Sequence, residues 1–332
     1  MNILILIFVS VVMGLAPMLV YAGFLWWLDR WEKEPFPLLA AAFVWGFLPS
    51  AVIALIAQIL LDIPTSALLY YNELTYELFS GSVIAPVTEE AIKGFAVLMI
   101  FIFFYREFDS LLDGILYGSL AGFGFAAIEN ILYFVSSGSE DPSGLGCLIF
   151  MRAFLFGLNH AFFTSLTGMG FAAARYQKNI FLKIFFPLLG LGAAMFAHGL
   201  HNGLVTFGIV GLPFAVLADW FGIVGVLIVA LVSLYSEARW IRHYLAEEVT
   251  LGTLTARQAA TVGSFGGRIG AEWAGFSRGP IGWWRTRRFY QQCAELAYKK
   301  HQLNKMGDEG GNVAIVARLR GEVRGLSESM VK

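Results

Sequence analysis

Residues 111–136 read LLDGILYGSLAGFGFAAIENILYFVS, an apolar run whose only charged residues are Asp113 and Glu129. A transmembrane helix needs about 20 mostly apolar residues, so this run is long enough to cross a bilayer. Six further runs of this kind occur along the chain. The sequence therefore predicts an all-α polytopic membrane protein with about seven transmembrane helices, at residues 3–28, 38–61, 81–104, 111–136, 147–172, 184–208 and 213–235.

The composition of the 332-residue chain supports this class. It is 58% hydrophobic and 14% charged, with a mean hydropathy of +0.68, whereas a soluble domain has about 25% charged residues. A soluble enzyme and a disordered protein are therefore excluded. The only cysteines, Cys147 and Cys293, cannot form a disulfide framework and lack the spacing of a metal motif. The net charge of −1 gives no support to a nucleic-acid partner.

The first apolar run, 3–28, lacks the basic segment that precedes the apolar core of a signal peptide. We therefore expect it to be retained as a membrane span. Its C-terminal end carries Trp26 and Trp27, with Trp31 shortly after. Tryptophan is enriched at membrane–water interfaces, so we expect these three residues at the interface.

Basic residues in the loops predict the orientation, because Lys and Arg accumulate on the cytoplasmic side. With seven spans, only the first, third and fifth connections contain basic residues, and these fall on the same side as the basic tail. We therefore expect an integral protein of the bacterial cell membrane with its N-terminus outside and its C-terminus in the cytoplasm. The basic loop residues are Arg30, Lys33, Arg106, Arg175, Lys178 and Lys183.

The chain divides by composition into a transmembrane domain, 1–236, and a polar tail, 237–332, which holds 15 of the 23 Lys and Arg residues. Two short amphipathic helices are expected in the tail, at 285–305 and 312–327. The tail composition favours a partly ordered, partly helical cytoplasmic appendage without chemistry of its own. Part of it also has the composition of a segment that lies on the anionic leaflet.

Five of the predicted spans carry polar residues that are costly inside a bilayer, and such residues indicate a functional site by default. With a rise of 1.5 Å per residue, the acids and histidines of four spans lie about 10–20 Å below the outer surface. This common depth predicts one site in the outer half of the membrane. The polar residues are Glu89, Glu90 and Lys93 on the third span, Glu129 and Asn130 on the fourth, Arg152, Asn159 and His160 on the fifth, His198, His201 and Asn202 on the sixth, and Asp219 on the seventh.

Residues four apart share a helix face and can orient one another. The pairs predicted on this basis are Glu89–Lys93, Glu129–Tyr133, His160–Thr164 and His198–Asn202. Some of these polar residues also have an interpretation without a catalytic role. Glu89 and Lys93 can form a buried ion pair, and His201 is interpreted as a hydrogen-bonded core residue. Arg152 is interpreted as an interfacial anchor, and Asp219 as an interfacial acid.

Such a group of residues can activate water. A carboxylate in an apolar pocket is a competent general base, and Asn or His can stabilise the oxyanion that forms on a carbonyl. Alternatively, two histidines and a carboxylate can hold a zinc ion whose bound water is the nucleophile. Both routes hydrolyse an amide without a covalent intermediate.

Four motifs occur in order on successive spans: Glu89-Glu90-x-x-Lys93, Phe125-x-x-x-Glu129-Asn130-x-x-Tyr133, His160-x-x-x-Thr164 and His198-x-x-x-Asn202. With these motifs the sequence resembles the PrsW family of intramembrane proteases, and more distantly the CAAX prenyl proteases. The resemblance covers about residues 20–235 and implies cleavage of membrane-anchored proteins, anti-sigma factors among them, near the outer membrane face. It implies that Glu89 and Glu90 carry the general base and that His160, His198 and Asn202 bind water, metal or oxyanion.

Two mechanisms stay open at this point. One is a zinc ion held by His160 and His198 with Glu90, to which His201 can add a third imidazole. The other is a glutamate that acts on water directly, without a cofactor. The sequence contains no HExxH motif, which argues against a zincin-like helix. Its one GxSxG match, at 275–279, lies in the polar tail away from the predicted spans, which argues against a serine nucleophile inside the membrane.

Two other classes compete with the protease. A proton- or ion-coupled transporter or channel would use the Glu and His residues as a relay and would need polar residues along a path to both faces. The inner halves of the third and sixth spans, such as 95–104 and 184–196, are almost purely apolar. This pattern favours a chamber that is closed on the inner side. A membrane scaffold without catalytic activity is the remaining class.

Overall fold

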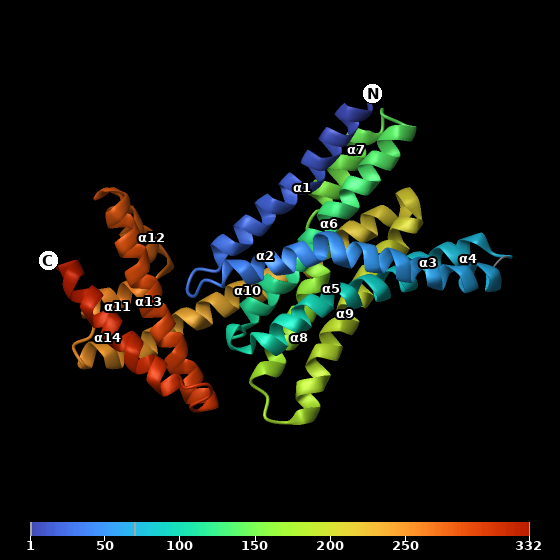
Figure 1. Cartoon of the computed structure of the whole chain (residues 1–332). Coiled ribbons are helices and arrows are strands. Elements are labelled where there is room, and N and C mark those ends of the chain that lie inside the picture. Colours follow the sequence, from blue (N-terminus) through green and yellow to red (C-terminus); the bar gives the residue numbers. More distant parts are fainter. Residues whose placement is uncertain (1, 70, 332) are drawn as a thin grey trace. The chain divides into compact units, whose positions relative to one another are not determined.

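The computed structural model describes residues 2–69 and 71–331, and these form helices and no strand (Figure 1). This confirms the predicted all-helical class. The helices are α1 (Ile3–Leu28), α2 (Phe36–Trp45), α3 (Ala51–Leu68), α4 (Glu73–Phe79), α5 (Ala85–Phe103), α6 (Leu111–Glu140), α7 (Leu145–Ile149), α8 (Asn159–Arg175), α9 (Ile180–Thr206), α10 (Gly208–Thr250), α11 (Ala256–Val262), α12 (Phe265–Phe276), α13 (Gly279–Met306) and α14 (Asn312–Val331). Shorter turns occur at η1 (Gly46–Ser50), η2 (Ser80–Ile84), η3 (Tyr105–Glu107) and η4 (Phe150–Leu155).

Six helical segments within the described residues are long and apolar enough to cross a membrane. They are Ile3–Leu28, Phe36–Leu68, Leu111–Glu140, Leu145–Arg175, Ile180–Thr206 and Gly208–Thr250. The remaining predicted span, 81–104, forms η2 and the 19-residue helix α5. Helix α5 is not among the six apolar segments because it carries three charged residues, Glu89, Glu90 and Lys93. Six spans are thus observed by length and composition, and the seventh stays a prediction.

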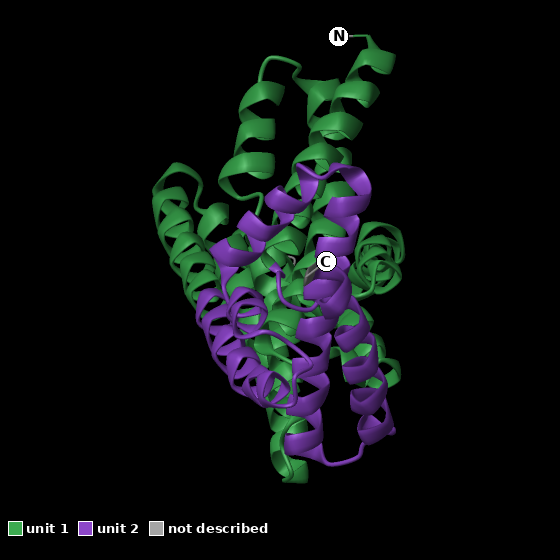
Figure 2. Cartoon of the chain, turned by 90° about the vertical axis from the view of Figure 1, so that its left-hand side faces the viewer, with its two compact units in different colours: residues 1–28, 34–230 green, residues 29–33, 231–332 purple. Residues whose placement is uncertain are grey.

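The chain forms two compact units, shown in different colours in Figure 2. Unit 1 comprises residues 1–28 and 34–230, and unit 2 comprises residues 29–33 and 231–332. The division at 230/231 and the expected boundary at 236/237 both lie inside α10, which continues to Thr250 without a break. Unit 2 also includes a short loop from the connection between α1 and α2.

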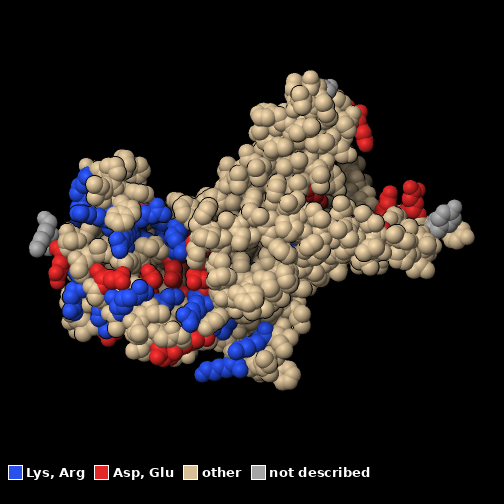
Figure 3. Space-filling view, in the orientation of Figure 1, with Lys and Arg blue, Asp and Glu red and all other residues tan. Residues whose placement is uncertain are grey.

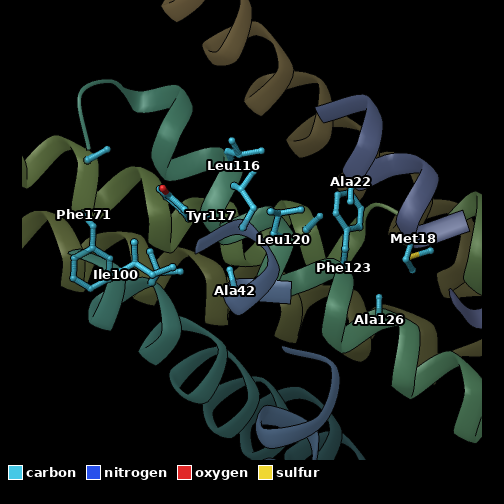
Figure 4. Packing of buried hydrophobic residues seen from close by; sticks show 14 of the residues in the cluster. Met18, Ala22, Ala42, Ile100, Leu116, Tyr117, Leu120, Phe123, Ala126 and Phe171 are labelled. Atoms are coloured by element: carbon cyan, nitrogen blue, oxygen red, sulfur yellow. The ribbon is translucent and has the colours of Figure 1, made fainter. Parts of the chain in front are cut away.

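Helix α6 forms the centre of unit 1, because 89% of its most apolar stretch is buried. It packs most extensively against α8 and α1. Figure 4 shows Leu116, Leu120 and Phe123 of α6 in the core together with Met18 of α1 and Ala42 of α2. The helix begins at a capping box, in which Ser110 and Asp113 bond each other's backbone amides. In the other apolar segments, only 6% to 28% of the most apolar stretch is buried, as expected for stretches that face lipid.

Unit 2 is built around α13, which packs against α12 and α14. The loop residue Trp31 is buried there, and its indole nitrogen donates to the Leu234 carbonyl at 3.1 Å. Arg268, also buried, donates to the Trp31 carbonyl at 3.2 Å. Trp31, expected at a membrane interface, is thus enclosed by residues of unit 2. The two helices expected in the tail correspond to α13 and α14.

Candidate active site

Six ionisable side chains meet in a buried group inside unit 1, which we call the Glu–His cluster. They come from four different helices, which correspond to the third, fourth, fifth and sixth predicted spans. Each member lies within an ion pair or hydrogen bond of another member. The members are Glu89, Glu90 and Lys93 of α5, Glu129 of α6, His160 of α8 and His198 of α9.

The close approach of α6 and α8 places His160 in the cluster. A Cβ atom at Gly122 would lie 2.3 Å from the carbonyl oxygen of His160, and one at Gly118 would lie 2.4 Å from that of Thr164. Only glycine permits backbones to come this close. Gly122 lies two helical turns before Glu129, on the same face of α6. The face of α6 that carries Gly118 and Gly122 therefore brings the Glu129 carboxylate within reach of His160.

Glu90 is fully buried and is held by three side chains. Its Oε1 atom lies 2.5 Å from Lys93 Nζ and accepts a hydrogen bond from His198 Nδ1 at 2.9 Å. Its Oε2 atom accepts from Thr164 Oγ1 at 2.9 Å. Thr164, which the sequence pairs with His160, thus binds Glu90 across the interface between α5 and α8. Both oxygens of Glu90 are used to hold neighbouring groups in place.

Glu129 forms a similar arrangement around the second histidine. Its Oε2 atom accepts from His160 Nε2 at 2.9 Å and from Arg152 Nη2 at 2.6 Å. Arg152 Nε also donates to Asn130 Oδ1 at 3.0 Å, and the guanidinium lies 3.8 Å from the centroid of the Tyr133 ring. Arg152, interpreted from the sequence as an interfacial anchor, instead pairs with Glu129. A carboxylate in a low-dielectric interior needs such a counter-charge.

Glu89 differs from Glu90 because one of its oxygens makes no hydrogen bond. Its Oε1 atom accepts from Gln58 Nε2 at 3.0 Å. Its Oε2 atom is buried without a hydrogen-bond partner and lies 3.8 Å from His198 Nε2. Gln58, on α3, was not predicted as a site residue. A single amide within the apolar run 38–61 was the available signal for it.

Glu89, His160 and His198 could together hold a metal ion, since their ligand atoms lie within 4.8 Å of one another. One carboxylate and two imidazoles are a ligand set of catalytic zinc sites. Each imidazole is bound at its other nitrogen by a carboxylate, Glu90 or Glu129, as metal-binding histidines usually are. The donor set thus fits a divalent metal. This donor set contains Glu89, whereas the sequence prediction names Glu90. Both oxygens of Glu90 already bind other side chains.

Lys93 supplies positive charge within the cluster. It is fully buried, with Nζ 2.5 Å from Glu90 Oε1, 3.6 Å from Glu89 Oε2 and 3.1 Å from His160 Nδ1. The ammonium also lies 4.2 Å from the centroid of the Phe125 ring. The predicted Glu89–Lys93 pair is therefore present, but the shorter contact is with Glu90. Lys93 balances two adjacent buried carboxylates that would otherwise repel each other.

Two predicted site residues contact structural partners instead of the cluster histidines. Asn202 Nδ2 donates to the Gly81 carbonyl at 2.8 Å and so holds α9 against η2. Asn130 accepts from Arg152, as described above. The sequence offers seven candidate catalytic residues, Glu89, Glu90, Glu129, Asn130, His160, His198 and Asn202. The structure brings five of them into the Glu–His cluster, whereas Asn130 and Asn202 bond to partners outside it.

Asp219, His201 and Asn159 form a second polar group of unit 1. Asp219 Oδ2 accepts from His201 Nδ1 at 2.7 Å and from Asn159 Nδ2 at 2.8 Å. Asp219 is buried between helices, although the sequence suggests an interfacial position. His201 is hydrogen-bonded, as its structural interpretation expects, and it does not belong to the metal-ligand set.

A helical membrane protein that encloses carboxylates and histidines in this way has the side chains that a membrane-embedded hydrolase requires. Residues 34–235 match the model of a family described as PrsW family intramembrane metalloprotease. The chain belongs to the PrsW family. No solved structure matches it.

Proteins named Protease PrsW are among its relatives. That of Oceanobacillus iheyensis is 30% identical over 213 residues, which cover 61% of this chain and 88% of the relative. That of Bacillus subtilis is 27% identical over 218 residues, covering 63% and 90%. That of Geobacillus kaustophilus is 29% identical over 195 residues, covering 58% and 77%.

These comparisons confirm that the protein is an intramembrane protease and an integral membrane protein of bacteria. They do not favour the transporter or the scaffold. The matched region ends at residue 235, so the polar tail lies outside the family match.

Proposed function

We propose that Glu89, His160 and His198 contact the water that hydrolyses the peptide bond, and that they do so through a zinc ion. One observation carries this proposal. Each imidazole is hydrogen-bonded to a carboxylate at one ring nitrogen, and Glu89 Oε2, 3.8 Å from His198 Nε2, makes no hydrogen bond. A buried carboxylate oxygen without a partner is costly unless a cation or a water completes its bonding.

The side chains around these three residues would orient them. Glu90 accepts the Nδ1 proton of His198 and Glu129 accepts the Nε2 proton of His160. The lone pair of His198 Nε2 is then on the side of Glu89, and that of His160 Nδ1 faces Lys93 Nζ at 3.1 Å, so Lys93 would have to release His160 when zinc binds. When bound, zinc would make a bound water more acidic and polarise the carbonyl. Lys93 is the cationic side chain nearest to these groups and would stabilise the oxyanion that forms when water adds to the carbonyl. Asn130 and Asn202 act as positioning residues.

The orientation and the substrate are part of the same proposal. Basic residues in alternate connections support a topology with seven crossings, of which α5 is the third. In this topology the N-terminus lies outside and the tail is cytoplasmic. The Glu–His cluster would then lie in the outer half of the membrane. The substrate would be a membrane-anchored protein cut near its outer end, with anti-sigma factors as the class that the family resemblance suggests.

Metal content and cleavage products test the mechanism together. We would measure zinc in purified wild-type protein, Glu89→Gln and Glu90→Gln, with Glu73→Gln on an exposed helix as the matched control. Terminal-peptide mass spectrometry of cells that carry each variant would identify cleaved membrane proteins.

We expect about one zinc per chain in the wild type, with zinc and new termini both lost in Glu89→Gln. Active wild-type protein without metal, together with an inactive Glu89→Gln, would overturn the zinc site and assign direct base catalysis to Glu89. New termini that persist in Glu89→Gln would overturn its role altogether.

A further inference from the structure

The turn between α12 and α13 exposes a group of large apolar side chains, which we call the hairpin tip. Trp273 and Phe276 end α12, and Ile281 and Trp284 begin α13; their exposed fractions are 69%, 58%, 70% and 53%. The rings of Trp273 and Phe276 lie 6.2 Å apart. Contiguous apolar groups of this kind on a water-exposed surface mark an interaction site.

Arginines surround the hairpin tip. The stretch from Trp273 to Ala294 contains four arginines and no Asp or Glu, so its net charge is +4. Two of the guanidiniums lie over exposed or half-exposed indoles, Arg287 over Trp283 at 5.3 Å and Arg288 over Trp284 at 5.2 Å. On the face seen in Figure 3, the part of unit 2 that contains the turn between α12 and α13 shows Lys and Arg side chains and no acidic ones. An anionic partner would therefore be attracted to this end.

The backbone holds the hairpin tip in a fixed form. Gly279 has φ +87°, a conformation that favours glycine, and it reverses the chain between the two helices. A Cβ atom at Gly275 would lie 2.7 Å from Thr286 Oγ1, so the helices approach closely there. The opposite face of α13 is already buried, through Thr286, Phe289 and Cys293. The apolar tip therefore does not belong to the internal core of unit 2.

Chain connections tie unit 2 to segments that are apolar enough to cross a membrane. Its loop at 29–33 joins two apolar segments, Ile3–Leu28 and Phe36–Leu68. Helix α10 runs from a third apolar segment into unit 2 without interruption. A bilayer is thus the surface that the hairpin tip can reach at the highest effective concentration.

We propose that the hairpin tip inserts into the headgroup region of the surrounding bilayer and binds anionic phospholipid. Tryptophan prefers the membrane–water interface, and arginines near an anionic surface add attraction. The apolar side chains would enter the boundary with the acyl chains while the four arginines contact lipid phosphates. This lipid site is separate from the Glu–His cluster, and it does not depend on the proposed mechanism.

Depth-dependent quenching in nanodiscs tests this site on the full chain. In a Cys147→Ser background, where Cys293 is buried, Ile281→Cys carries an environment-sensitive fluorophore. Val313→Cys, 55% exposed on α14, is the matched control. The discs contain brominated phosphatidylcholine, alone or mixed with phosphatidylglycerol.

We expect strong quenching at position 281, increased by phosphatidylglycerol, and little at position 313. Replacing Arg285 and Arg288 by Gln should lower the ratio of inserted to free tip by about 5-fold for each arginine removed, whereas replacing both by Lys should preserve it. Equal quenching at the two labelled positions, or quenching at 281 that is the same in neutral and anionic discs, would overturn the proposal.

Discussion

Glu90 Oε1 lies 2.9 Å from His198 Nδ1, although 108 residues separate them in the sequence. The bond uses one ring nitrogen of His198 and leaves Nε2 on the side of Glu89, 3.8 Å from its Oε2 atom. Adjacent glutamates therefore have different environments. Glu90 holds other side chains in place, and Glu89 keeps an oxygen without a hydrogen bond.

Glu90→Gln and Glu89→Gln should differ in the size of their effect. Loss of a carboxylate that orients a ligating histidine typically costs 10–100-fold in activity or metal affinity, so Glu90→Gln should retain about 1–10% of wild-type cleavage. Glu89→Gln should show none. Cleavage rates per folded protein, measured on a substrate identified in cells, check this difference. Equal activity in the two variants would contradict separate roles.

Gly122→Ala should disturb the site from a distance. The added methyl would lie 2.3 Å from the His160 carbonyl oxygen, so α6 and α8 must separate. Such overpacking costs about 1–3 kcal/mol, and activity should fall because His160 moves away from Glu129. Gly192→Ala is the control, since nothing lies within 4 Å of its Cβ position. Thermal unfolding in detergent and cleavage assays check this prediction. If Gly122→Ala and Gly192→Ala have the same effect, separation of α6 and α8 is excluded as the cause.

Arg152→Met should destabilise unit 1, because Glu129 would keep only His160 as a partner. Leaving a partly buried carboxylate without its counter-charge costs about 1–3 kcal/mol. The double variant Glu129→Gln, Arg152→Met should recover stability but not activity, which a double-mutant cycle measures. Arg106→Met, on an exposed residue, serves as the control. No coupling between Arg152 and Glu129 would show that their 2.6 Å contact does not stabilise the protein.

Cys147 reports the topology without an engineered residue. It is exposed, whereas Cys293 is buried. With seven crossings, Cys147 and Tyr71 lie on the outer side, so a membrane-impermeant thiol reagent should label Cys147 in intact cells. Tyr71→Cys in a Cys147→Ser background should be labelled equally. If only one of the two positions reacts, α5 does not cross the membrane, and the seven-span prediction fails.

The stability of unit 2 should decrease in acid because of His301, which stacks on Trp240 with ring centroids 4.6 Å apart. Burial, helped by Lys305, lowers the pKa of His301 to about 4, whereas an unfolded histidine has a pKa of about 6.5. As the pH falls from about 6.5 to about 4, the unfolded state binds a proton that the folded state does not. Stability is therefore complete above this window and declines within it.

Hydrogen exchange of α13 above and within the acid window checks this prediction, after correction for intrinsic exchange rates. Protection should decrease in acid in the wild type and change less in His301→Gln. Acid-independent protection in the wild type would show that His301 does not control the stability of unit 2.

Much of the membrane domain could be predicted because its signals are local. A bilayer has no water to solvate a charge, so polar residues in apolar runs such as Glu89 or His198 stand out without knowledge of the fold. Arg152 and Gln58 were harder to interpret. Their roles depend on partners 22 to 31 residues away, Asn130, Glu129 and Glu89, which helix packing selects.

Hydropathy and motif order do not depend on packing, so they predicted the class of the protein and the residues of the Glu–His cluster. Helix packing groups Glu89, and not the adjacent Glu90, with both histidines as residues that could hold a metal ion. Successive helical residues point about 100° apart, so the rotation of α5 against α8 and α9 made that choice. Packing also decided that Trp31 is enclosed by the tail helices, because burial is a property of the assembled units.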